Sequence, residues 1–196
     1  MLITNNFEVN HPIDRVWMFF ENIPQVAKCL PGTELNEEIG EDHYAGGVVI
    51  GLGPVKLSFD GNAKILERNE DTHTIKVDAA GAEKKGRGQA AMLVDAALET
   101  TASGTKVAVT MDLQLSGAAA QYGRGLVSDV TAVLLDDFAA NAGARLDAIA
   151  AGRSPDEVGQ LASSSPSGFA IGLRAVRMAL ARIFRRFFMP YSPEAV

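Results

Sequence analysis

The stretch Val107–Ala151 reads VAVTMDLQLSGAAAQYGRGLVSDVTAVLLDDFAANAGARLDAIAA, and its hydrophobic period changes at Gly117. Before Gly117, apolar and polar residues alternate, which is typical of a strand with one buried face. From Gly117 to Ala151 the apolar residues recur every three or four positions, which predicts one long helix. The length of this helix lets it span a whole sheet.

The rest of the chain predicts short elements joined by turns. Leu2–Val9 has the pattern of a strand, which His11 and Pro12 end. Two short helices follow, the second over Asn22–Pro31. From Leu35 the hydrophobic period is two, and turn residues divide the sequence into six strands. We therefore expect an α+β fold, in which a curved antiparallel sheet wraps around the long helix.

Small residues are frequent on both sides of the predicted interface between sheet and helix, for example Gly46, Ala79 and Ala119. Facing small residues can leave a dry cavity, and such cavities are the usual binding sites of apolar ligands. The same residues can also close-pack as an ordinary core, so both interpretations stay open. The candidate ligand-binding residues are Phe20, Val48, Ile50, Phe59, Met92, Leu113, Leu115, Tyr122, Leu126 and Val130.

The end of the chain has a different composition. Residues 152–168 include SSSPSG and few apolar residues, which predicts a flexible linker. Residues 169–189 predict an amphipathic helix, and residues 190–196 form a tail. The predicted helix carries five arginines, and each would cost roughly 2.5–3.5 kcal/mol at a bilayer centre. We therefore expect this helix to lie in the membrane interface. The candidate membrane-binding residues are Phe169, Leu173, Arg174, Val176, Arg177, Leu180, Arg182, Ile183, Phe184, Arg185, Arg186, Phe187 and Phe188.

Composition excludes several classes of protein. The apolar content of 47% is enough for a real core. Residues 1–167 carry 13 Lys/Arg and 23 Asp/Glu, whereas residues 168–196 carry five Arg and one Glu. The acidic body argues against nucleic-acid binding, which needs clustered cations. One cysteine, Cys29, excludes a disulfide framework. The N-terminus lacks a signal-peptide pattern, so we expect a cytoplasmic protein.

Isolated polar residues give little indication of catalysis. His11, His43 and His73 are not spaced as metal ligands, and we expect them to be solvated. Asp136 and Asp137 are neighbours on a helix and so diverge by about 100°, which does not suit a paired acid and base. We expect this pair to be solvated as well. We therefore expect no enzyme activity, no metal site and no covalent cofactor.

Three stretches resemble a known family. They read FEVNHPIDRVWMFFENIPQVAKCLPG at Phe7–Gly32, GLGPVKLSFDG at Gly51–Gly61 and SGAAAQYGRGLVSDVTAVLLDDFAANAGARL at Ser116–Leu146. In this order they resemble the G subunit of carbon monoxide dehydrogenase, a branch of the START-like (Bet v 1-like, SRPBCC) superfamily. The resemblance implies a helix-grip fold with an apolar pocket, which we expect over residues 1–151.

The resemblance also implies a function. Family members accompany molybdenum-containing hydroxylases such as aerobic carbon monoxide dehydrogenase and are associated with bringing them to the cytoplasmic membrane. Electrons from such an enzyme must reach respiratory quinone, so we expect a bound quinone, menaquinone or ubiquinone, with menaquinone favoured. We expect the protein on the inner face of that membrane. Two alternatives stay open: an assembly or recruitment factor that binds ordinary lipid or no ligand, and a START-like enzyme acting on an apolar small molecule.

Three sites allow two interpretations each. Cys29 is either a reactive thiol or a small buried apolar group. Lys84, Lys85 and Arg87 form either a plain surface cluster or a contact for an acidic partner. The Tyr122 hydroxyl either hydrogen-bonds a quinone carbonyl or contacts water while the ring packs.

Overall fold

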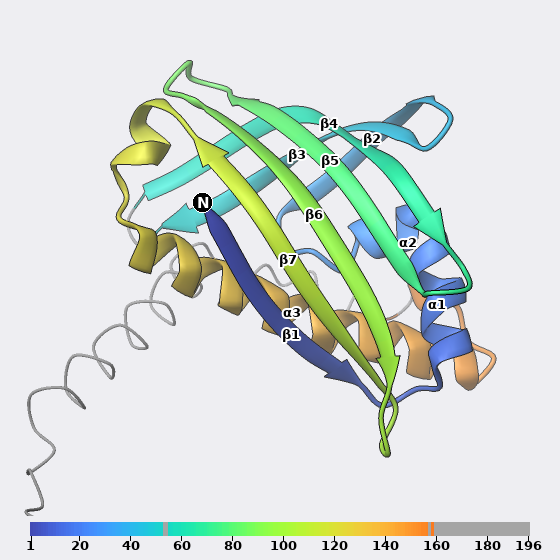
Figure 1. The fold of residues 1–196 in the computed structure, drawn as a ribbon. Coiled ribbons are helices and arrows are strands. Elements are labelled where there is room, and N and C mark those ends of the chain that lie inside the picture. The colour runs from blue at the N-terminus through green and yellow to red at the C-terminus, as the bar shows by residue number, and fades with distance from the viewer. Residues whose placement is uncertain (53–54, 157, 159–196) are drawn as a thin grey trace, which may run out of the picture.

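The computed structural model describes residues 1–52, 55–156 and 158 (Figure 1). The order of elements agrees with the order predicted: one strand, two short helices, six strands and a long helix. The elements are β1 (Leu2–Val9), α1 (Ile13–Glu21), α2 (Ile23–Ala27), β2 (Thr33–Gly40), β3 (His43–Leu52), β4 (Val55–Asn69), β5 (Thr74–Glu83), β6 (Gln89–Thr100), β7 (Thr105–Leu115), η1 (Gly117–Gln121) and α3 (Arg124–Ala150).

The strands form a single antiparallel sheet of seven strands in the order β1-β7-β6-β5-β4-β3-β2. The sheet is strongly curved, α3 runs across its concave face, and α1 and α2 lie at the end of the sheet where α3 ends (Figure 1). This arrangement is the expected α+β helix-grip fold. β1 and β2 are the edge strands, so the sheet does not close into a barrel.

The concave face meets α3 and the short helices through two clusters of buried side chains. The large cluster consists of Phe7, Val9, Val16, Trp17, Phe19, Phe20, Cys29, Ile65, Ile75, Leu98, Val107, Val109, Phe138, Ala142 and Leu146. The small cluster consists of Leu57, Phe59, Ala119 and Val130, with half-buried Val48, Ile50, Val55, Ala90, Leu115, Tyr122, Leu126 and Leu134 packed against them. Each fully buried large apolar side chain contributes roughly 1.5–3 kcal/mol, so these clusters are the main source of stability.

A row of three glycines crosses the sheet between the two clusters. Gly46 of β3 lies opposite Gly61 of β4, which lies opposite Gly81 of β5. A Cβ atom on Gly46 would lie 2.5 Å from the Glu34 carbonyl oxygen, and one on Gly61 would overlap the carbonyl of Ala80. The backbone therefore leaves no room for a Cβ atom at Gly46 and Gly61, whereas one on Gly81 would make a tight contact of 3.1 Å with the Asp60 carbonyl oxygen. Glycine inside a strand is typical of close backbone approach and of bends in curved sheets.

The predicted helix Gly117–Ala151 is wrong in its first part. A short 3₁₀ helix, η1, comes first, Tyr122 is extended with ψ 125°, and α3 begins only at Arg124. The Ala118 amide donates a 2.6 Å hydrogen bond to the carbonyl oxygen of Arg87, in the turn between β5 and β6. This tertiary bond fixes η1 to the sheet and gives it a direction different from that of α3. The predicted second helix, Asn22–Pro31, is likewise shorter and covers only α2.

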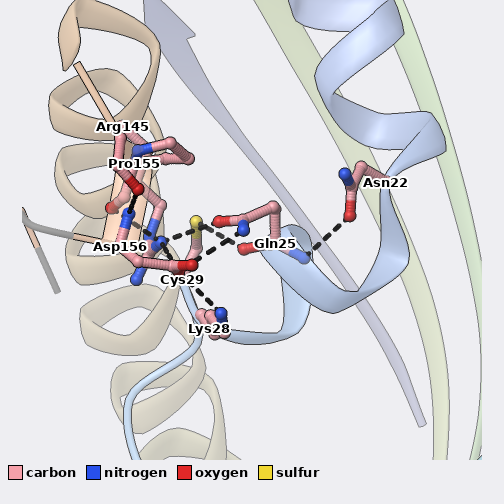
Figure 2. A network of polar contacts seen from close by, with 8 residues as sticks. Asn22, Gln25, Lys28, Cys29, Arg145, Pro155 and Asp156 are labelled. Carbon is pink, nitrogen blue, oxygen red and sulfur yellow. Dashed lines mark hydrogen bonds and ion pairs between the residues drawn. The ribbon is translucent and has the colours of Figure 1, made fainter. Parts of the chain in front are cut away.

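The segment after α3 packs against α2 through a polar network (Figure 2). Arg145, 5% exposed, donates to Gln25 Oε1 at 2.8 Å and to the Pro155 carbonyl oxygen at 3.1 Å. Asp156 accepts a hydrogen bond from Lys28 Nζ at 2.6 Å. The first residues of the predicted linker 152–168 are therefore attached to the domain. The rest of that linker from residue 159, the predicted helix 169–189 and the tail 190–196 lie outside the described residues.

We expect Gly61→Ala to lower the free energy of unfolding by roughly 1–3 kcal/mol, because the added methyl group overlaps the Ala80 carbonyl. Gly143→Ala on α3 is the matched control. It meets nothing within 4 Å and should stabilise the helix by up to about 1 kcal/mol. Urea unfolding followed by the fluorescence of Trp17, the single tryptophan, measures both. Equal stability of the two variants would contradict the role of the glycine row.

Candidate functional site

The candidate site lies on the concave face, next to the glycine row. The strand register aligns Ala63 with Ala79, Ala79 with Met92 and Met92 with Leu113. These residues alternate with outward-facing neighbours such as Ala80, so their side chains point toward α3. All four are only half-buried, although the clusters on both sides of them are buried. Sheet and helix therefore do not fully cover each other at this row.

The structure brings together nine of the ten candidate ligand-binding residues. Seven of them belong to the small cluster or pack against it, and they are Val48, Ile50, Phe59, Leu115, Tyr122, Leu126 and Val130. Met92 and Leu113 lie in the row beside them. Phe20 lies apart in the large cluster, where its ring packs edge-on against Phe19 and Phe138 at 6.3 and 6.1 Å. Phe20 therefore supports the fold at the α1 end and does not face the other nine.

The small residues that leave space on the concave face differ in part from those singled out in the sequence. Ala119 is 4% exposed within the small cluster, so it fills space there. Gly61, Ala63 and Gly81, which the sequence reasoning did not single out, supply the small concave positions together with Ala79. Following the alternation along the strand from Val55 to Asn69 and along the next strand would have indicated all three, because every second residue faces the helix.

An ion pair between buried Glu83 and exposed Arg87 closes the end of the sheet beside the small cluster. Glu83 is 4% exposed and accepts hydrogen bonds from Arg87 Nη2 at 2.8 Å, from Arg87 Nε at 3.3 Å and from the Lys85 amide at 2.9 Å. The hydrogen bond from the Arg87 side chain is the main cause that lowers the pKa of Glu83, from 4.5 to about 2. The ion pair also raises the pKa of Arg87, with a smaller contribution from the nearby Tyr122.

The cationic turn is thus not a plain surface cluster. Arg87 belongs to the ion pair and also donates to the Lys56 carbonyl oxygen at 3.4 Å. Lys84 lies 3.0 Å from Asp60, and Lys85 is exposed. The Tyr122 ring packs half-buried against the small cluster. Its hydroxyl forms no hydrogen bond with any residue that the structure describes, which leaves a donor beside the apolar surface.

His11, His73 and Asp137 depart from the prediction that they are solvated, whereas Asp136 is exposed as predicted and His43 is half-buried. His11 is 8% exposed and its Nε2 lies 2.9 Å from Asp147 Oδ1, so it joins the turn after β1 to the end of α3. The ring of His73 packs edge-on against Trp17 at 5.2 Å. Asp137 is half-buried with one carboxylate oxygen fully buried. Within residues 1–52 and 55–156, no three His, Cys, Asp or Glu side chains gather as metal ligands would.

Cys29 is a structural residue. Its side chain is fully buried, and its Sγ donates to the Gln25 carbonyl oxygen at 3.3 Å. Burial raises the pKa of the thiol to about 12, so the nucleophilic thiolate is scarce at neutral pH. The interpretation of Cys29 as a small buried group is therefore confirmed.

A separate hollow of about 310 Å³ lies on the convex face of the sheet. Its lining includes outward-facing Thr74, Ala97 and Ala108 and the ion pair between Lys76 and Asp95, whose charged atoms are 3.2 Å apart. None of the candidate ligand-binding residues lines this hollow. Its mixed polar lining does not suit an apolar ligand.

The family model described as the G subunit of carbon monoxide dehydrogenase (CoxG) matches residues 6–146. The chain belongs to the CoxG family. The match runs from the second half of β1 through most of α3 and therefore covers nearly the whole helix-grip domain. A search of proteins with curated functions found no match to this CoxG family member.

Solved structures show the same fold. A conserved protein from Geobacillus kaustophilus aligns with a TM-score of 0.67 at 21% identity, covering 75% of this chain and 95% of the other. Mll3558 from Rhizobium loti aligns with a TM-score of 0.54 at 17% identity, covering 71% and 95%. TTHA0849 from Thermus thermophilus aligns with a TM-score of 0.52 at 12% identity, covering 72% and 97%. At these identities the structural similarity establishes only the fold of this CoxG family member.

The candidate membrane-binding residues, Phe169 to Phe188, lie outside the described residues. Within the part that the structure describes, no helix is both long enough and apolar enough to cross a membrane.

We expect Glu83→Gln to destabilise the protein at neutral pH. A carboxyl with a lower pKa in the folded chain stabilises the fold above its unfolded value of 4.5, and this contribution disappears as the pH falls toward 2. The stability difference between wild type and Glu83→Gln should therefore shrink over that interval. Urea unfolding at a series of pH values measures it, with exposed Glu99→Gln as the control. A difference that stays constant below pH 4.5 would contradict the ion pair's role.

Proposed function

We propose that this protein is an accessory protein of a molybdenum hydroxylase of the carbon monoxide dehydrogenase type. We also propose that it binds a respiratory quinone, with menaquinone as the favoured ligand. The observation that carries the proposal is the half-buried apolar row Ala63–Ala79–Met92–Leu113 between two buried clusters. Membership of the CoxG family supports the link to the hydroxylase.

The chemistry of the concave face suits such a ligand. A quinone has a flat ring with two carbonyl oxygens and a long apolar tail. The row and the small cluster present methyl, thioether and branched aliphatic groups, against which ring and tail can pack. Tyr122 supplies a phenol that can donate to a carbonyl oxygen. Glu83, the buried carboxylate nearby, is already neutralised by Arg87, so it does not oppose an apolar ligand.

The same residues support binding in preference to catalysis. An enzyme acting on an apolar molecule needs an acid or base that can give up or take a proton near neutral pH. Glu83, with its pKa of about 2, stays ionised and bound to Arg87. Cys29, with its pKa of about 12, stays protonated. The quinone supplies the electron-accepting chemistry, and this chain's residues hold and orient it.

Membrane attachment is the second part of the proposal. The sequence of residues 169–189 predicts a helix with aromatic and aliphatic residues on one side, four arginines outside that side and Arg177 near its edge. Arginines near an anionic leaflet contribute about 1 kcal/mol each, in addition to the burial of the apolar side. The helix would lie in the inner face of the cytoplasmic membrane, where the quinone pool is located.

We expect Ala79→Phe to weaken quinone binding at least roughly tenfold, since the phenyl ring enters the space beside Met92 and Leu113. Ala80→Phe is the matched control, because Ala80 is exposed on the convex face and its substitution should leave binding unchanged. Titration with menaquinone in detergent, read by Trp17 fluorescence, measures the affinity.

Mass spectrometry of protein purified with native lipids identifies the ligand directly. If wild type carries no quinone and binds added quinone without saturation, quinone binding is wrong. If Ala79→Phe loses quinone but still supports electron delivery by the hydroxylase, the protein is a recruitment factor.

Deletion of residues 168–196 should release the protein from anionic vesicles while the domain stays folded, because the predicted membrane helix is removed. Arg→Glu substitutions at Arg182, Arg185 and Arg186 should weaken binding, and high salt should do so in part. Co-sedimentation with vesicles measures binding, and circular dichroism checks the fold. Unchanged co-sedimentation of the deletion variant would show that the tail is not the membrane anchor.

A further inference from the structure

Five cations gather at the end of the domain where α3 begins. They are Lys56, Lys84, Lys85, Arg87 and Arg124, and we call this surface the basic end. Arg87 Nη2 donates to the Lys56 carbonyl oxygen, and the Lys84 amide donates to the Ser58 carbonyl oxygen at 2.8 Å. The turn between β5 and β6, the start of β4, η1 and the start of α3 lie together at this end of the molecule (Figure 1).

The basic end is unusual in an acidic domain. It holds five of the 13 Lys/Arg within residues 1–167, a segment that also carries 23 Asp/Glu. Only Lys84 and Arg87 of the five take part in ion pairs among the described residues, with Asp60 and Glu83. Lys56, Lys85 and Arg124 are exposed and enter none of them. These three exposed cations on an acidic body favour an orientation in which the basic end faces an anionic surface.

The basic end also includes apolar surface. Val55, Tyr122 and Leu126 of the small cluster are half-buried there and keep part of their surface in contact with solvent. Val49 of β3, on the convex face of the sheet, is 43% exposed. Apolar groups bordered by lysines and arginines suit the boundary between phospholipid headgroups and acyl chains. Protein interfaces, in contrast, are depleted in lysine, and three of these five cations are lysines.

We propose that the basic end docks on anionic phospholipid headgroups, so that the small cluster faces the bilayer from which an apolar ligand arrives. This inference rests on the proposed function for the identity of that ligand. It assigns to the membrane a surface of the folded domain, separate from the predicted helix 169–189.

The length of the chain allows both contacts on one membrane. The described chain leaves the domain beside α2, at the opposite end of α3 from the basic end (Figure 1). The 27 residues of α3 span roughly 40 Å. Residues 157–168 can reach at most about 40 Å at 3.3 Å per residue. The predicted membrane helix can therefore lie in the same leaflet that the basic end contacts.

Charge reversal in the full-length protein tests the proposal. The test variant carries Lys56→Glu, Lys85→Glu and Arg124→Glu, and the matched control carries Arg15→Glu, Lys64→Glu and Arg153→Glu, which are exposed residues outside the basic end. Both variants change the net charge equally. With vesicles of phosphatidylcholine and phosphatidylglycerol, we expect binding of the test variant to weaken at least roughly tenfold and that of the control to change much less. Equal loss in both variants, or no loss in the test variant, would overturn the proposal.

A fluorescent label gives an independent readout of orientation. Cys29 is fully buried, so a single introduced cysteine can be labelled selectively. A label at Ala120→Cys, on exposed η1, should be quenched by spin-labelled lipids, whereas a label at Glu99→Cys, at the other end of β6, should not. Quenching at Glu99 alone would overturn the proposal. If the test variant binds vesicles normally but no longer binds the purified hydroxylase, the basic end is a protein contact.

The outcomes separate this inference from the proposed function. Menaquinone titration in detergent needs no membrane, so wild type that fails to bind quinone there refutes the proposed ligand. The vesicle experiment compares the membrane binding of the two charge variants and uses no quinone, so its outcome does not depend on the titration. Test variant and wild type should bind menaquinone equally in detergent, because Lys56, Lys85 and Arg124 are exposed on the outside of the domain.

Discussion

The close approach of the backbones at Gly46, Gly61 and Gly81 is the constraint on which the rest of the structure depends. A Cβ atom on Gly46 or Gly61 would overlap the backbone of a neighbouring strand, so these strands come this near only because both positions are glycine. The sheet that holds the row curves around α3, and both of its buried clusters lie on the concave face (Figure 1). The glycine row, having no side chains, leaves the concave face unfilled where ligand binding is proposed.

The two ends of the domain are closed by different chemistry. At the α2 end, aromatic packing and the network of Arg145, Gln25 and Asp156 join the short helices to the end of α3. At the other end, the ion pair of Glu83 and Arg87 fixes the turn between β5 and β6 next to η1. Ends held by packed and paired side chains, together with an apolar middle, suit a container for a hydrophobic molecule. The buried side chains of His11, Glu83 and Arg145 all take part in contacts that hold elements of the fold together.

The polar residues show most clearly where sequence reasoning fails. His11, Asp137 and Arg87 have no pattern along the chain that distinguishes them from solvated residues. His11 is buried because the end of α3 brings Asp147 beside it, across 136 positions of sequence. Arg87 is paired because the register of β4 and β5 turns Glu83 inward beside Phe59. Contacts of this kind depend on the packing of whole elements, which no local pattern encodes.

The sequence by itself determined the order of elements and the alternation of most strands, because hydrophobic period and turn residues act over a few neighbouring positions. β2 is the exception, since all but its first residue are exposed. The three quoted stretches indicated the family. The sequence also indicated nine of the ten candidate residues that now lie together. The tertiary structure alone decided that Phe20 belongs to the opposite cluster and that Tyr122 separates η1 from α3. It alone aligned the three glycines across the sheet and brought the start of β4 with Lys56 and the start of α3 with Arg124 to the turn that holds Lys84, Lys85 and Arg87 (Figure 1). The physical reason is that strand register and helix packing set distances between residues far apart in the chain.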